Sequence, residues 1–143
     1  MRDREKQDRR IVAVVGDGDI ARRKGFKLWH QHLTSKLSLP FEVTGVEDFR
    51  WEEFYVFGPG SKREYQRLRQ NQPSYRDVFD LEAIRMYSFS EWCLVPDELK
   101  AHLRRKTDGK RFVMGLSELR ATIKRSRNYQ LLHDYAVWLA NYI

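Results

Sequence analysis

The chain has 143 residues, a net charge of +7 and a hydrophobic share of 41%. This length and composition exclude wholesale disorder, and the chain is too short for a doubly wound nucleotide-binding enzyme with a separate substrate domain. The single cysteine, Cys93, excludes an internal disulfide framework, and no apolar segment approaches the roughly 20 residues that cross a bilayer. We therefore expect a cytoplasmic protein with no membrane partner.

The first ten residues contain no apolar side chain after Met1. Because such a segment buries too little surface to offset its ordering entropy, we expect a flexible tail over residues 1–18 and one domain over residues 19–143.

A glycine-containing stretch, "VVGDGDIA", follows this polar segment, and its glycines match the spacing of a dinucleotide-binding loop. Asp17 and Asp19 would place negative charge where the pyrophosphate lies, and no G-K-[ST] sequence follows. The same stretch fails as an EF-hand, because Arg22 occupies the sixth position that requires glycine. The stretch is best interpreted as a turn before the first helix.

The next elements are predicted from the spacing of apolar residues, from composition, and from residues that begin or end helices and strands. Apolar residues at helical spacing predict a helix that begins near Phe26 and ends before Pro40. Residues 39–49 and 51–58 are rich in aromatic and β-branched residues and predict two strands. Ser61 and Glu64 form a capping box, which predicts a short basic helix over residues 63–70.

Residues 77–84 alternate between apolar and acidic side chains, which predicts a half-buried strand with Phe79, Leu81 and Ala83 facing inward. A hairpin is expected to follow, with a two-residue turn at Asp108-Gly109 that places Leu103 opposite Met114. In the same register, Ala101 lies opposite Leu116.

The C-terminal part of the chain predicts a short strand over residues 119–123 and then a helix. That helix is capped by Ser126 or Asn128, and its apolar face is formed by Leu131, Leu132, Tyr135, Trp138, Leu139 and Tyr142. The fold class is therefore α+β, a small antiparallel barrel or sheet flanked by an N-terminal and a C-terminal helix.

Charge is segregated along the chain, with +5 over residues 1–41, −5 over residues 42–98 and +7 over residues 99–143. Carboxylates from neighbouring strands or loops can bind calcium without a fixed motif, because calcium accepts six to eight oxygen ligands in loose geometry. Polar residues on the solvent face of a sheet explain the same acids. The candidate ligands are Glu47, Asp48, Glu52, Glu53, Asp80 and Glu82.

The basic residues support an alternative function, which is binding of nucleic acid or of an acidic protein. Cations near the hairpin turn and before the last helix could contact phosphates, with Tyr129 available to stack on a base. Protection of the hairpin edge explains the same charges. These candidate residues are Arg104, Arg105, Lys106, Lys110, Arg111, Lys124, Arg125 and Arg127.

The sequence does not predict an enzyme. His30 and His32 lie two residues apart and would point in different directions on a helix, which excludes a shared metal site there. His133 and Asp134 are adjacent in sequence, so their side chains diverge on a helix and form no dyad. Cys93 lies beside Trp92 in an apolar run, which is typical of a buried small residue.

Three stretches, "LSLPFEVTGV", "DGKRFVMGLSELRATI" and "NYQLLHDYAVWLANY", resemble the small prokaryotic calcium-binding proteins of the CcbP type. The resemblance covers about four fifths of the chain, and its motifs are mostly structural. It implies a barrel similar to that of Src-homology-3 domains, with helices at both ends, and a non-enzymatic module that binds calcium through surface carboxylates. For this chain it implies the same six acidic candidates.

Overall fold

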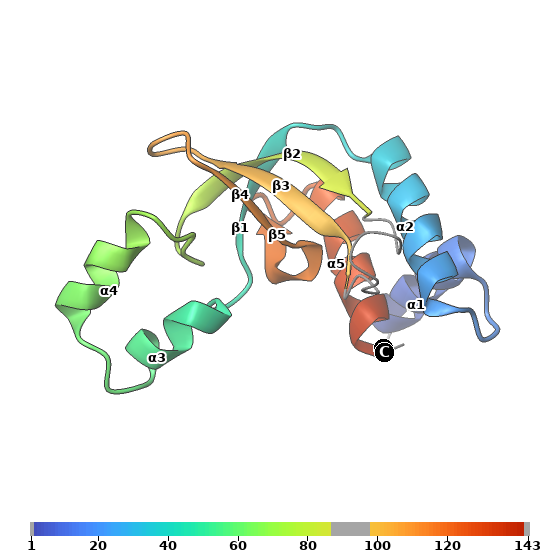
Figure 1. The fold of residues 1–143 in the computed structure, drawn as a ribbon. Coiled ribbons are helices and arrows are strands. Elements are labelled where there is room, and N and C mark those ends of the chain that lie inside the picture. The colour runs from blue at the N-terminus through green and yellow to red at the C-terminus, as the bar shows by residue number, and fades with distance from the viewer. Residues whose placement is uncertain (1, 87–97, 142–143) are drawn as a thin grey trace.

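The computed structural model describes residues 2–86 and 98–141 and has an α+β fold built around a twisted antiparallel sheet (Figure 1). Its five strands lie in the order β4-β3-β2-β1-β5. Their bounds are β1 Phe41–Gly45, β2 Val78–Arg85, β3 Lys100–Arg105, β4 Arg111–Gly115 and β5 Leu119–Ala121. The α+β class is confirmed. Among the described strands no pairing joins β4 to β5, so the sheet is open and a closed barrel is not confirmed.

The helices form two groups on the two sides of the sheet (Figure 1). One group consists of α1 Arg2–Val15, α2 Arg22–Lys36 and α5 Arg127–Asn141. The other consists of the 3₁₀ helix η1 Arg50–Glu52, α3 Glu53–Val56 and α4 Lys62–Arg69, and it extends away from the sheet as an arm over residues 50–69 (Figure 1). A second 3₁₀ helix, η2 Leu116–Glu118, links β4 to β5. None of these helices is long and apolar enough to span a bilayer.

The hydrophobic core lies between the sheet and the first group of helices, as the helical periodicity predicts. Trp29 of α2 and Tyr135 of α5 are buried and meet edge to face, with ring centroids 5.8 Å apart. Ser126 caps α5, since its Oγ accepts a hydrogen bond of 3.1 Å from the backbone N–H of Tyr129. The helix after Phe26 and the C-terminal helix are therefore confirmed.

The expectation of a flexible tail over residues 1–18 is wrong for Arg2–Val15, which form α1. Ile11 and Val15 lie four residues apart, on one face of this helix, and both are buried. Arg10 Nε contacts Asp134 Oδ2 of α5 at 2.7 Å, and Gln7 also donates a hydrogen bond to that carboxylate. The polar segment thus docks through a few apolar residues near its end and one ion pair.

The strand expected over residues 51–58 is also wrong, because this stretch forms η1 and α3. Trp51 and Tyr55 lie four residues apart and pack on Tyr65 of α4, with ring centroids 5.6 and 5.8 Å from it. Aromatic residues at that spacing suit a helical turn against a second helix, and this packing overrides their strand propensity.

The hairpin of β3 and β4 is confirmed, but its register differs from the expected one. Leu103 pairs with Phe112, and Ala101 pairs with Met114. The turn spans Lys106 to Gly109 and is closed by a hydrogen bond from Arg105 N–H to Lys110 O of 2.8 Å, with Gly109 at a φ of 73°. Because the shift is two residues, the same side chains still face the core.

Strand β2 is confirmed, but it contains an irregularity between Leu81 and Ala83. The bulge changes the alternation, so that Ile84 is buried and Ala83 is only half-buried. The capped helix after Ser61 is confirmed as α4, and Ser61 Oγ accepts a hydrogen bond of 3.1 Å from Glu64 N–H. Cys93 lies outside the described residues.

Candidate functional site

The loop between β1 and η1 holds the densest group of candidate acids. It begins where β1 ends at Gly45, whose N–H donates to Tyr75 O at 3.2 Å. A Cβ on Gly45 would lie 2.6 Å from the Tyr75 Cα, so only glycine permits this close backbone approach. The chain then turns outward through Glu47 and Asp48 before η1 begins at Arg50.

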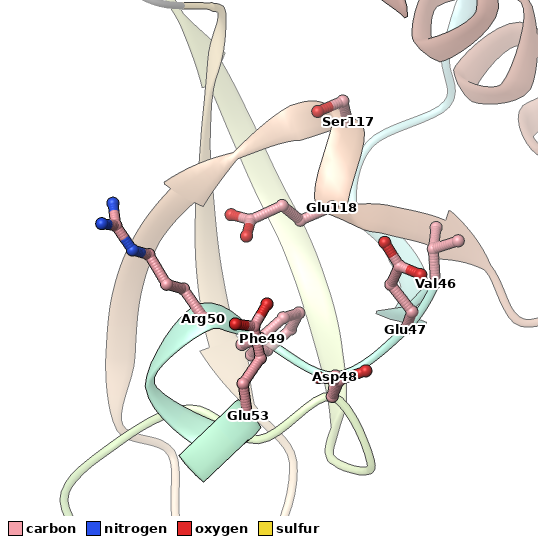
Figure 2. A pocket seen from close by; sticks show the side chains of 8 residues that line it. All are labelled: Val46, Glu47, Asp48, Phe49, Arg50, Glu53, Ser117 and Glu118. Atoms are coloured by element: carbon pink, nitrogen blue, oxygen red, sulfur yellow. The ribbon is translucent and has the colours of Figure 1, made fainter. Parts of the chain in front are cut away.

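An open pocket of about 350 Å³ lies beside this loop (Figure 2). Glu47, Asp48 and Glu53 line it from the loop and from α3, and Glu118 lines it from η2. We call this pocket, with its four carboxylates, the acidic pocket. Val46, Phe49, Arg50 and Ser117 complete its lining.

The geometry brings together three of the six predicted ligands. Figure 2 shows the side chains of Glu53 and Glu118 on two sides of the pocket, with Glu47 and Asp48 along the loop and Arg50 at one edge. Within residues 2–86 and 98–141, no group of three or more acidic, histidine or cysteine side chains stands close enough to hold a metal ion. The carboxylates of the acidic pocket therefore surround one space without converging on one point.

Glu52, the fourth loop acid, does not line this pocket and has no exposed surface. Its Oε2 accepts hydrogen bonds from Tyr65 Oη at 2.5 Å and from Ser74 Oγ at 2.7 Å. Its Oε1 accepts from the backbone N–H groups of Tyr75 at 2.7 Å and Phe49 at 3.3 Å. Because four donors occupy this carboxylate, Glu52 fixes the arm and the acidic loop and is not placed to bind an ion from solvent.

Asp80 and Glu82 lie on β2, outside the acidic pocket, and both are paired with cations. Lys106 Nζ lies 3.1 Å from Asp80 Oδ1 and 3.5 Å from a carboxylate oxygen of Glu42. The hydrogen bond to Asp80 raises the pKa of Lys106 above its ordinary value. Arg111 Nε lies 3.4 Å from Glu82 Oε1. The structure therefore does not join these two acids to the loop acids.

Arg105, a candidate for phosphate binding, is only 3% exposed and has no surface to offer a nucleic acid. Its guanidinium contacts the carboxylates of Asp77 at 2.9 Å and Asp108 at 2.8 Å. It also donates to the carbonyls of Arg69, Gln70 and Gln72 at the end of α4. Arg105 is thus a structural cation that holds the arm against the hairpin.

The other basic candidates divide into those whose side chains are engaged by an ion pair or a hydrogen bond and those that are exposed and engaged by neither among the described residues. Lys106 and Arg111 form the ion pairs given above, and Lys110 Nζ donates to Gln70 O at 2.6 Å. Tyr129 stacks on His133, with ring centroids 6.0 Å apart. The remaining candidates are exposed: Arg104, Lys124, Arg125 and Arg127.

Two residues of the pocket, Glu118 and Arg50, are not among the residues predicted from the sequence. Glu118 lies far from the loop in sequence and reaches it because β5 pairs with β1, where Val46 N–H donates to Glu118 O at 2.9 Å. Only knowledge of this strand pairing could have found it. Arg50 lies between two candidate acids in sequence and was counted only in the charge of its segment.

Comparisons with known proteins place the fold. No protein-family model matches the chain, and no protein of curated function matches it. Two solved structures are similar. One, described as a calcium-binding protein in its calcium-binding form, is 16% identical and has a TM-score of 0.59, and the match covers 96% of this chain and 91% of the other. The other is CcbP from Anabaena, at 14% identity and a TM-score of 0.55, with coverage of 95% and 90%. The resemblance to CcbP-type proteins is confirmed at the level of the fold.

Proposed function

We propose that this protein is a non-enzymatic module that binds calcium at the acidic pocket. The observation that carries the proposal is the state of three loop acids. Glu47, Asp48 and Glu53 line one pocket, and in the described structure their carboxylates accept no hydrogen bond and form no ion pair. The other three predicted ligands, Glu52, Asp80 and Glu82, lie outside the pocket and are occupied by hydrogen-bond donors or cations.

The donor set suits a hard cation. The pocket is lined by carboxylate oxygens and by Ser117, and its lining residues include no sulfur and no imidazole. Oxygen ligands of this kind are the ones that calcium prefers. Calcium also tolerates irregular geometry and water ligands, whereas magnesium requires near-octahedral coordination. These properties suit carboxylates that surround a space without a fixed centre.

The affinity is expected to be low, on the order of a millimolar dissociation constant, as in weak calcium modules. Glu47 and Glu53 are exposed, so ordering their side chains around an ion costs conformational entropy. Arg50 adds a repulsive charge at the edge of the pocket. One of the two similar structures is a calcium-binding protein in its calcium-binding form, which supports calcium as the ligand.

Isothermal titration calorimetry of the full chain with calcium tests the proposal. The combined variant Glu47→Gln, Asp48→Asn and Glu53→Gln is expected to abolish the binding heat. The matched variant Asp80→Asn with Glu82→Gln also removes two carboxylates, but from ion pairs outside the pocket, and is expected to bind as the parent does. Absence of any heat from the parent protein at millimolar calcium refutes the proposal, as does equal loss in both variants.

A further inference from the structure

The outer end of the arm carries two phenylalanines that face solvent. Phe57 is 80% exposed and Phe54 is 53% exposed. The arm already has its own aromatic packing, in which Tyr55 stacks on Tyr65 and Trp51 covers both rings. Phe54 meets this group edge to face at the ring of Tyr55, with ring centroids 5.1 Å apart. The exposed surfaces of the two phenylalanines therefore do not contribute to the aromatic packing of Trp51, Tyr55 and Tyr65 that holds the arm together.

A tight turn, Gly58-Pro59-Gly60, holds this end of the arm in shape. Gly60 N–H donates to Phe54 O at 3.2 Å, which closes the turn. A Cβ on Gly58 would lie 2.5 Å from Phe54 O, and a Cβ on Gly60 would lie 2.4 Å from the ring of Tyr55. Because both glycines sit where a larger residue does not fit, the turn is closely packed and presents Phe57 outward. We call Phe54, Phe57 and this turn the arm tip.

The helix that follows the arm tip, α4, carries exposed cations. Lys62, Arg63 and Arg67 are exposed on α4, and no hydrogen bond or ion pair engages them among the described residues. Arg63 and Arg67 lie one helical turn apart and line a shallow depression with Ser61 and Glu64. Between residues 54 and 69 the sequence has four cationic side chains and one acidic side chain.

We propose that the arm tip docks on membranes whose surface carries anionic phospholipids. Phe54 and Phe57 enter the headgroup region, and Lys62, Arg63 and Arg67 bind the lipid phosphates. Exposed apolar side chains at the tip and exposed cations on the following helix complement a bilayer, where anionic headgroups lie outside an apolar interior. In Figure 1 the arm extends from the body of the molecule, so a flat surface can reach its end.

Other anionic partners fit this surface less well. Single-stranded nucleic acid is bound in grooves where successive bases stack on aromatic rings. The depression on α4 is lined by Ser61, Arg63, Glu64 and Arg67, so the two exposed phenylalanines of the arm tip do not line the same groove as these cations. A second copy of the chain is disfavoured, because it would bring the same cations together.

Docking of this kind requires no spanning segment, so it is consistent with a chain in which no described helix could span a bilayer. The expectation of no membrane partner rests only on the lack of an apolar segment long enough to cross a bilayer, and surface docking needs no such segment. The proposal is also independent of calcium, since Lys62, Arg63 and Arg67 lie on α4 and not in the acidic pocket.

The test is flotation of the full chain with vesicles in a chelating buffer that removes calcium. Vesicles of phosphatidylcholine mixed with phosphatidylglycerol are compared with vesicles of phosphatidylcholine alone. We expect binding only to the anionic vesicles. Phe57→Ser is expected to reduce partitioning about tenfold, and Arg63→Gln with Arg67→Gln by about tenfold or more.

Two matched variants control for apolar surface and for charge elsewhere. Ile123→Ser removes an apolar residue that is 67% exposed outside the arm, and Lys124→Gln with Arg125→Gln removes two exposed cations. Both are expected to bind as the parent does. The proposal is overturned if neutral and anionic vesicles bind equally, if neither binds, or if the controls lose binding as the arm variants do. Tighter binding of single-stranded DNA or polyglutamate than of anionic vesicles overturns it as well.

Discussion

The phenol of Tyr65 donates a hydrogen bond of 2.5 Å to Oε2 of Glu52, and both side chains are buried. This bond joins α4 to the segment that carries the acidic pocket, because Glu52 Oε1 also accepts from the N–H of Phe49. Burial, followed by this hydrogen bond to Glu52, raises the pKa of Tyr65 above its ordinary value of 10. The arm therefore depends on a buried carboxylate whose partners are all hydrogen-bond donors without charge.

Tyr65→Phe is expected to lower the free energy of unfolding by about 1–3 kcal/mol, because it leaves a buried carboxylate oxygen with one donor fewer. Urea denaturation measures the loss. Tyr55→Phe is the matched control, since its hydroxyl donates to the exposed Glu64 at 3.1 Å, and it is expected to change stability by less than about 0.5 kcal/mol. Equal effects of the two variants would contradict the role given to Glu52.

Gly25→Ala is expected to destabilise the packing of α2 on α5. A Cβ on Gly25 would lie 2.5 Å from Cζ2 of Trp138, and both residues are buried. Overpacking costs about 1–3 kcal/mol, which exceeds the roughly 1 kcal/mol that alanine gains in helix propensity. The urea midpoint should therefore fall. Gly18→Ala serves as control, because no atom lies within 4 Å of its Cβ position, and a comparable loss there would refute the packing argument.

Much of the architecture could be predicted because burial imposes a period on the sequence. Helices α2 and α5 and strand β2 each bury one face, and their apolar residues recur accordingly. The hairpin register was not predictable to the residue. A shift of two leaves every side chain on its face, so the hydrophobic pattern cannot distinguish the two registers.

The features that could not be predicted depend on contacts with residues distant in the sequence. Trp51 and Tyr55 suit a strand by composition and form helical turns because Tyr65 packs against them. In the same way, local sequence shows that Glu52 and Arg105 are charged but not that each is enclosed by hydrogen-bond partners from another element. Glu118 joins the acidic pocket through strand pairing alone.

Acid is expected to weaken the hairpin turn through Asp108. Hydrogen bonds from Arg105, and one from the N–H of Lys110, lower the pKa of Asp108 from its ordinary 3.8 to about 2. The unfolded chain therefore binds this proton at a higher pH than the folded chain does, so the contribution of Asp108 is complete above about pH 5 and is lost as the pH falls from about 4 toward 2. The Asp108 carboxylate is partly exposed, so the effect should shrink in high salt.

Urea denaturation between pH 2 and about pH 6 checks this prediction. The difference in unfolding free energy between the parent and Asp108→Asn should be constant above about pH 5 and narrow below about pH 4. Asp17→Asn, at an exposed aspartate with no partner among the described residues, should show no such narrowing. An NMR titration that gives Asp108 its ordinary pKa would contradict the expectation.

Arg50→Gln is expected to strengthen calcium binding. Arg50 lines the acidic pocket at its edge, and in the described structure its guanidinium forms no ion pair that would neutralise it (Figure 2). A unit charge that acts through water on a divalent ion within a Debye length costs enough to lower affinity about two- to fivefold. Calorimetry at low ionic strength should detect the gain, and added salt should reduce it. Arg63→Gln removes the same charge from α4, outside the pocket, and should leave calcium affinity unchanged. If Arg50→Gln instead weakens binding, Arg50 organises the loop, and the repulsion argued from the pocket geometry is wrong.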